Sequence, residues 1–186
     1  MNILWDFDGT LIDTYPSYTK CFKQILPDVS EQEIYNKLKK SFAHAIESFH
    51  MTDEQEKEVR HLVDRISPED VTPFSGLEEV LQYAKVNVIM THKDRKNVLR
   101  ILNHHHLTGY FTDMVTSDDG FPRKPDSSSY TYLHQKYQLD LAIGDRNIDL
   151  IPAKGLGIKT CIFQNKQVDA DYYLASYYDF FNVVTR

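Results

Sequence analysis

The feature that most restricts the fold of this chain is an alternation of short β-rich runs with helical segments after residue 73. The β-rich runs cover residues 86–90, 114–116, 139–143 and 159–163, and residues 172–174 form a further candidate strand. Segments with apolar residues at helical spacing separate these runs. Strands that alternate with helices pair in parallel, because each crossover helix returns the chain to the same end of the sheet. The pattern therefore predicts an α/β fold with a parallel sheet.

The first strand of this sheet is separated from the others along the sequence. An apolar run over residues 3–7 is closed by a glycine turn, which predicts a buried strand. The residues that follow, 14–73, carry helix signals throughout. We therefore expect one α/β core, made of residues 1–13 and 74–186, with an all-helical insertion of residues 14–73 after the first strand.

Helix starts are predicted by three pairs in which Ser or Thr is followed three residues later by Glu or Gln, the pattern of a capping box. These pairs are Ser30–Glu33, Thr52–Gln55 and Ser75–Glu78. Between the first two, apolar residues recur with a period of 3.6 over residues 34–49, which predicts one continuous helix. Residues 91–94 are expected to open another helix directly after the 86–90 strand, and residues 177–184 a last one.

Composition limits the partners and the compartment that we expect. Apolar residues make up 41% of the chain and charged residues 26%, which suits a packed core. The apolar runs are too short to span a bilayer, and we expect no secretory signal in the first residues. Only Cys21 and Cys161 are available, so we expect no disulfide framework and a reducing, cytoplasmic location. The net charge of −6 argues against binding to nucleic acid or anionic membranes.

Acidic residues gather at the predicted strand ends, where parallel α/β sheets bind their ligands. Asp6 and Asp8 end the first strand, and Asp145 and Asp149 follow the 139–143 run. Carboxylates that crowd together need a proton or a cation between them. Oxygen ligands in this number suit Mg²⁺ bound by a few carboxylates and a substrate phosphate. The sequence therefore predicts a magnesium site, although Asp149 could also cap the helix expected over residues 148–153.

Two further residues could bind a phosphate at the same edge. Thr91 ends the 86–90 strand, where its hydroxyl and the first N–H groups of the following helix could hold an anion. Lys124 follows the 114–116 run and supplies a compact positive charge. Together with a carboxylate nucleophile, these groups are the components that phosphoryl transfer requires.

At this point the residues resemble the four motifs of the haloacid dehalogenase-like hydrolases. The run from Asp6 to Thr14 resembles the first motif and Thr91 the second. Lys124, within the sequence RKPD, resembles the third, and the sequence GDRNID over residues 144–149 the fourth. The resemblance covers essentially the whole chain. It implies a Rossmann-like parallel sheet core and identifies the insertion as the small all-helical cap of the phosphoglycolate phosphatase-like branch.

The resemblance implies a catalytic or metal-binding role for each acidic residue of these motifs. Asp6 is the implied nucleophile, which forms an aspartyl-phosphate. Asp8 is the implied general acid for the leaving group and then the base for the attacking water. Mg²⁺ is expected to be bound by Asp6, by Asp145 and by the backbone carbonyl of Asp8. Asp149 is expected in the outer coordination sphere of the metal.

The resemblance also implies a set of phosphate contacts. Thr91 and Lys124 are expected to bind the phosphoryl oxygens, together with the backbone at Gly9 and His92, and Lys124 is expected to screen the charge of Asp6. His92 departs from the family pattern, which often has Asn after the threonine of the second motif. The sequence leaves the role of its side chain open.

The function expected from these residues is a Mg²⁺-dependent phosphatase for a small phosphorylated substrate. A phosphomutase of the beta-phosphoglucomutase type on the same scaffold is the alternative, and a catalytically silent binding module is a further one. A dehalogenase is disfavoured by Asp8, because the dehalogenases of the family lack the second aspartate of the first motif. The physiological substrate and the oligomeric state stay open.

Overall fold

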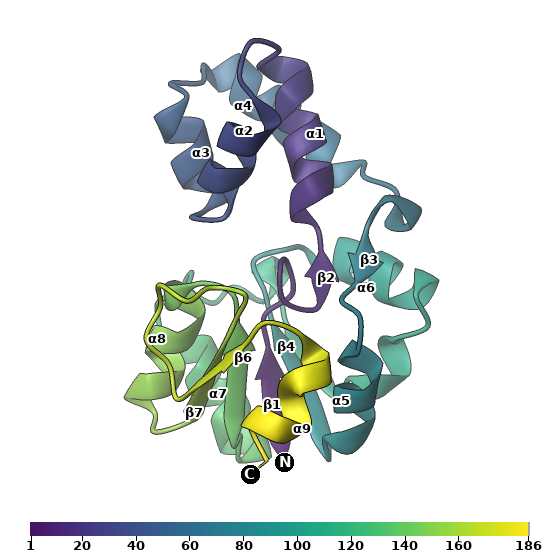
Figure 1. The fold of residues 1–186 in the computed structure, drawn as a ribbon, viewed down its shortest axis with the longest axis vertical. Coiled ribbons are helices and arrows are strands. Elements are labelled where there is room, and N and C mark those ends of the chain that lie inside the picture. Colours follow the sequence, from purple (N-terminus) through teal and green to yellow (C-terminus); the bar gives the residue numbers. More distant parts are fainter. Residues whose placement is uncertain (186) are drawn as a thin grey trace. The chain divides into compact units, whose positions relative to one another are not determined.

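A computed structural model describes residues 1–185 as two compact units (Figure 1). The α/β unit contains residues 1–12 and the chain from Pro73 onward, and the helical unit is Asp13–Thr72. These divisions lie one residue from the expected boundaries. Short strands β2, Ile12–Asp13, and β3, Thr72–Pro73, form a two-stranded sheet where the chain passes between the units.

The α/β unit is built on a parallel sheet of six strands, in the order β5-β4-β1-β6-β7-β8. The strands are β1, Asn2–Trp5; β4, Val86–Met90; β5, Asp113–Val115; β6, Leu141–Gly144; β7, Lys159–Phe163; and β8, Tyr172–Leu174. Each predicted strand is present, so the predicted parallel α/β sheet is confirmed. From β1 the sheet extends through β4 and β5 on one side, and through β6, β7 and β8 on the other. The end of β1 therefore lies between the ends of β4 and β6.

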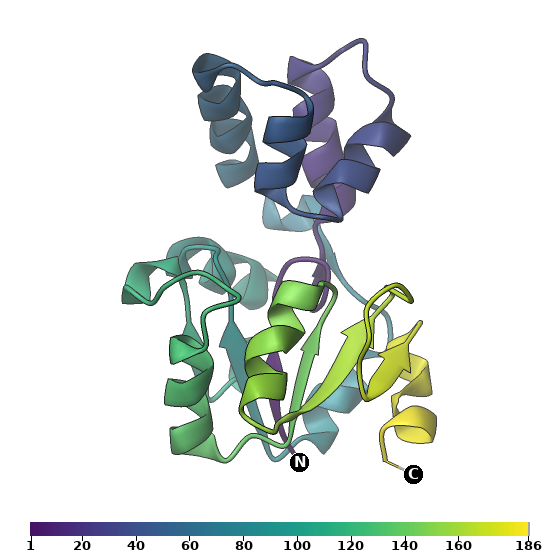
Figure 2. The same cartoon turned by 90° about the vertical axis from the view of Figure 1, so that its left-hand side faces the viewer.

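Helices lie on both faces of this sheet (Figure 2). They are α5, Leu77–Tyr83; α6, Arg95–His104; α7, Ser128–Tyr137; α8, Asn147–Gly155; and α9, Phe180–Val183, with 3₁₀ turns η2, Thr108–Tyr110; η3, Ser117–Asp119; and η4, Tyr177–Asp179. Leu4 and Val88 pack with Tyr130 and Leu133 of α7 on one face. Trp5, the next residue of β1, contacts the ring of Tyr177 edge-on. The alternation of side chains along β1 thus supplies both cores of the unit.

The helical unit contains α1, Tyr15–Ile25; α2, Glu31–Leu38; α3, Phe42–Ser48; α4, Asp53–Asp64; and the 3₁₀ turn η1, Pro68–Asp70. The predicted capping box at Thr52–Gln55 is confirmed in both of its hydrogen bonds. The single helix predicted over residues 34–49 is wrong, because α2 ends at Leu38 and the extended Ser41 caps α3. Both helices bury their apolar residues in one cluster, so the apolar period continues across the break.

Two other predicted helices also differ from the structure. Gly76, not Ser75, caps α5, and it does so in the left-handed conformation at φ 80° without a side-chain hydrogen bond. The predicted last helix is split into η4 and the short α9. Within the described residues, no helix combines the length and apolar composition that crossing a membrane requires.

A buried asparagine ties the centre of the sheet to its surroundings. Asn87 in β4 is 2% exposed and accepts a hydrogen bond from Trp5 Nε1 at 2.9 Å. Its amide nitrogen donates to the carbonyls of Leu81 at 2.9 Å and Tyr110 at 3.3 Å. One side chain therefore satisfies three groups that are contributed by β1, α5 and η2.

We expect the substitution Asn87→Leu to lower the free energy of unfolding by about 2–4 kcal/mol, because it leaves these buried groups without partners. Urea unfolding measures the change. Asn103→Leu is the matched control, since Asn103 is exposed on α6 and its side-chain oxygen accepts from Thr108 Oγ1. Equal stability of the two variants would show that the Asn87 contacts contribute nothing.

Candidate active site

The carboxyl end of β1 is where the predicted site residues of the α/β unit gather. Asp6 directly follows β1, and its backbone N–H donates to Ile143 O of β6 at 2.9 Å. Asp145 directly follows β6, and Asp149 lies in the first turn of α8. The connections on the two sides of β1 lead away from each other. The space between them, at the carboxyl end of β1, is the position where open α/β sheets bind ligands.

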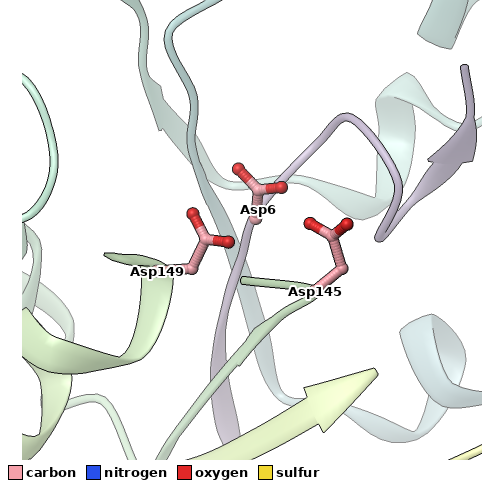
Figure 3. A group of neighbouring side chains, drawn as sticks. All are labelled: Asp6, Asp145 and Asp149. Carbon is pink, nitrogen blue, oxygen red and sulfur yellow. The ribbon is translucent and has the colours of Figure 1, made fainter. Parts of the chain in front are cut away.

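Three carboxylates lie close together at this point (Figure 3). Asp6, Asp145 and Asp149 each offer an oxygen within 4.8 Å of the others, and their exposed fractions are 2%, 0% and 1%. Figure 3 shows the three side chains directed toward a common space. Buried carboxylates at this spacing repel one another unless cations or protons compensate them. The cluster can therefore hold a metal ion.

The buried ammonium group of Lys124 supplies part of that compensation. Lys124 Nζ donates to Asp6 Oδ1 at 2.6 Å and to Asp149 Oδ1 at 2.9 Å. Burial by itself lowers the pKa of Lys124, but the carboxylates of Asp149 and Asp6 outweigh it and raise the pKa overall. Lys124 is therefore a permanent positive charge between two of the three carboxylates.

Asp149 both caps a helix and pairs with Lys124. Its Oδ2 accepts from the backbone N–H of Arg146 at 3.0 Å, the capping position of α8, while Oδ1 accepts from Lys124. Burial raises the pKa of Asp149, but Lys124 and Arg146 outweigh burial and lower the pKa below its usual value. The capping role of Asp149 is thus observed, and its expected role at a metal ion stays a prediction.

The pKa of Asp6 is raised even though Lys124 contacts its carboxylate. Burial and the neighbouring Asp149 charge raise the pKa of Asp6 to about 7, although Lys124 and Arg146 oppose them. Without a metal, Asp6 therefore retains a proton in neutral solution to an extent that no ordinary aspartate does. A divalent cation could take the place of that proton, because the donor set consists of carboxylate oxygens.

The structure places Asp8 apart from the carboxylate cluster. Its side chain is 23% exposed, and its Oδ1 lies 3.4 Å from the ammonium nitrogen of Lys93. Gly9 adopts φ 81° and donates its N–H to Ile12 O at 2.8 Å. Gly9 therefore serves the turn after β1, and the backbone phosphate contact expected of it stays a prediction.

Thr91 follows β4, as expected, but it does not begin a helix. Its hydroxyl accepts from the backbone N–H of Lys93 at 3.2 Å, and α6 starts only at Arg95. Asp94 caps that helix by accepting from Asn97 N. The helix start expected directly after the 86–90 strand is therefore wrong, because Asp94 caps α6. The phosphate contact expected of Thr91 stays a prediction.

Several polar residues of the site were not predicted. Lys93 pairs with Asp8, Arg146 lies 3.7 Å from Asp145 and 3.5 Å from Asp149, and Asn165 donates to Asp145 O at 3.0 Å. Arg146 directly follows Asp145, and Lys93 lies two positions after Thr91. Their positive charges close to predicted motif residues could have identified them. Asn165 is 20 residues from its partner, and no local pattern identifies it.

Comparison with known proteins gives the family of this chain. The model of the family "Haloacid dehalogenase-like hydrolase" matches residues 3–163, which include all the site residues described above except Asn165. The chain belongs to the haloacid dehalogenase-like hydrolases. The resemblance expected from the four motifs is therefore confirmed.

Relatives within the haloacid dehalogenase-like hydrolases include named phosphatases. "Phosphoglycolate phosphatase" from Vibrio cholerae serotype O1 is 26% identical over 83% of this chain and 80% of its own length. The structure of a hydrolase from Streptococcus pneumoniae TIGR4 is 31% identical with a TM-score of 0.68, covering 89% of this chain and 94% of that one. A Thermotoga maritima structure, provisionally assigned as a beta-phosphoglucomutase, is 20% identical with a TM-score of 0.74 over 98% and 97% of the two chains. At that identity the likeness shows the fold alone.

The glycine before Asp145 keeps space for the Asp149 side chain. A Cβ atom at Gly144 would overlap Asp149 Cβ and lie 3.0 Å from its Cγ. The close packing of β6 against α8 thus depends on the absence of a side chain at residue 144.

We expect Gly144→Ala to lower the free energy of unfolding by about 1–3 kcal/mol, because the added methyl group displaces Asp149 from Lys124 and Arg146. Gly155→Ala, at the other end of α8, is the matched control, since a Cβ there meets no atom within 4 Å. Thermal or urea unfolding measures both variants. A Gly144→Ala protein as stable as the Gly155→Ala protein would contradict the close packing.

Proposed function

We propose that this hydrolase is a Mg²⁺-dependent phosphatase, which cleaves a small phosphomonoester through an aspartyl-phosphate on Asp6. The observation that carries the proposal is the contact of buried Asp6 with Lys124 inside a cluster of three carboxylates. The names of the Vibrio relatives support a phosphatase. The cytoplasmic location expected from the sequence, and the role of the helical unit as a cap, belong to the same proposal.

In the first step, a carboxylate oxygen of Asp6 attacks the phosphorus atom, and the bond from phosphorus to the ester oxygen breaks. Asp8 gives its proton to the departing alcohol oxygen. In the second step, Asp8 takes a proton from water, whose oxygen attacks phosphorus and releases inorganic phosphate from Asp6. Asp8 suits proton transfer because it is partly exposed, unlike Asp6.

The cationic groups of the site have separate tasks in this scheme. Lys124 Nζ attracts the phosphoryl oxygens that approach Asp6 and balances the charge that develops on them. The Thr91 hydroxyl is a further donor for these oxygens. Lys93 holds the Asp8 side chain at the edge of the site. Such fixed charges need no rearrangement during the reaction, which is the main source of catalysis in phosphoryl transfer.

The residues present fit a Mg²⁺ ion. Asp6 and Asp145 offer buried carboxylate oxygens, and we assign the backbone carbonyl of Asp8 as a third protein ligand. Asp149 belongs outside this set, because both of its oxygens already accept hydrogen bonds from Lys124 and Arg146. When bound, Mg²⁺ offsets the negative charge shared by the carboxylates and the substrate phosphate.

The raised pKa of Asp6 predicts a pH-dependent affinity for Mg²⁺. From the usual aspartate pKa up to about 7, the folded protein holds a proton that the unfolded chain releases, and this contribution to stability is lost as the pH rises through that range. Mg²⁺ must displace the same proton. We therefore expect affinity about tenfold higher at pH 8 than at pH 6, measured as the Mg²⁺ dependence of Tm at each pH. Equal affinity at both pH values would contradict the raised pKa.

A phosphomutase is the alternative that shares this chemistry. In a mutase, the phosphoryl group on Asp6 passes to a sugar hydroxyl instead of water, and a bisphosphate is needed to load the enzyme. Release of inorganic phosphate in the absence of any bisphosphate separates the phosphatase from the mutase. A protein with neither activity would support a silent binding module.

The experiment that tests the proposed function is phosphate release from a panel of phosphomonoesters with and without Mg²⁺. The panel contains phosphoglycolate, sugar phosphates, nucleotides and an aryl phosphate. We expect Asp6→Asn to lower kcat at least about a thousandfold, since it removes the nucleophile. Asp28→Asn makes the same chemical change at an exposed residue and should leave kcat unchanged.

Two results would contradict the proposed mechanism. Full activity of Asp6→Asn would exclude the aspartyl-phosphate. Activity of the wild-type protein that does not depend on Mg²⁺ would exclude the metal site assigned to Asp6 and Asp145.

A further inference from the structure

We propose that His92 is a positioning residue whose imidazole holds the main chain of Lys124, and thereby holds Lys124 Nζ against Asp6 and Asp149. The backbone N–H of Lys124 donates to His92 Nε2 at 2.9 Å. His92 lies in the segment after β4, 32 residues from Lys124. The effect of this hydrogen bond on catalysis rests on the proposed function, whereas the hydrogen bond itself does not.

The segment 91–95 contacts the loop that carries Lys124 at two places. Ser117 N donates to Lys93 O at 3.2 Å, and Asp118 Oδ2 accepts from Arg95 N at 2.6 Å. The Arg95 guanidinium also binds Asp119 Oδ2 at 2.8 Å. These contacts secure the start of the loop, directly after β5. The His92 contact secures its other end, at Lys124 itself.

Only one protonation form of His92 can make this contact. Nε2 must carry no proton in order to accept, so the imidazole is neutral with its proton on Nδ1. Burial and the positive charges of Lys124, Arg123 and Arg146 lower the pKa of His92 to about 4, with Asp149 opposing them. The charges that face the ring therefore favour the accepting form throughout the neutral pH range.

The site needs this support because the position of Lys124 Nζ depends on where its main chain is held. The ammonium group must lie between Asp6 and Asp149, which come from two other segments of the chain. The Lys124 side chain is fully buried, so a shift of its backbone moves the charge that binds the phosphoryl oxygens. Supporting contacts of this kind commonly change affinity or activity by about 10–100-fold.

The test compares two substitutions of His92 with a matched control. His92→Leu removes the acceptor, and His92→Gln restores one through its amide oxygen. His134→Leu is the control, because His134 Nδ1 accepts from the backbone N–H of Leu139 at 3.0 Å, just before β6 begins and thus at the opposite end of that strand from Asp145. Both leucine variants lose a contact of the same chemistry.

Three measurements distinguish positioning from a general structural role. We expect His92→Leu to lower kcat/KM about 10–100-fold and to weaken inhibition by inorganic phosphate, with partial recovery in His92→Gln. His134→Leu should lose stability but keep the wild-type kinetic constants. Hydrogen exchange at the Lys124 amide, followed by NMR, should become faster in His92→Leu and stay slow in His134→Leu.

The outcomes separate failure of this inference from failure of the proposed function. If the wild-type protein releases phosphate and His92→Leu matches it in kcat/KM, phosphate inhibition and Lys124 exchange, then His92 does not position Lys124. If the wild-type protein has no phosphatase activity, the proposed function is wrong, and the exchange rate at the Lys124 amide alone decides whether His92 holds the loop.

Discussion

The interaction on which the site depends is the buried ammonium group of Lys124 between the carboxylates of Asp6 and Asp149. Lys124, in the loop after β5, is 118 positions from Asp6 at the end of β1 and 25 positions from Asp149 at the start of α8. Removing one partner of a buried ion pair leaves an uncompensated charge, which costs more than the pair contributes. The three segments are therefore held in one arrangement, and the strand order that brings their ends together becomes a requirement of the site.

The site carries more negative charge than it can balance by itself. Three buried carboxylates face two positive side chains, Lys124 and the partly exposed Arg146. The raised pKa of Asp6 is a consequence of burial and of this excess of negative charge. A fold selected for stability alone would remove one carboxylate. The retained repulsion has a use in the proposed chemistry, because it creates affinity for a divalent cation and leaves Asp6 available to attack phosphorus. Stability and function thus oppose each other at this one residue.

Local patterns in the sequence predicted the elements better than their ends. The strands over residues 159–163 and 172–174 were predicted with their observed bounds, because apolar β-rich runs end where the chain leaves the sheet. The helix predicted over residues 34–49 was wrong, because two helices that face one core keep a common apolar period across the break at Ser41. The acidic site residues were predictable as strand-end carboxylates. The contact from Asn165 to Asp145 was not, because it depends on how distant loops fold over the strand ends.

The position that departs from the family pattern shows what that position has to supply. The family resemblance leads us to expect Asn after the threonine of the second motif, and this chain has His92 there. An asparagine amide and a neutral imidazole share one property, an atom that accepts a hydrogen bond from a backbone N–H. They differ in reach and in that imidazole can gain a proton. The positive charges around His92 suppress that protonation, so the substitution keeps an acceptor available to the Lys124 loop. On this reasoning, what residue 92 has to supply in this chain is an acceptor for the backbone N–H of Lys124.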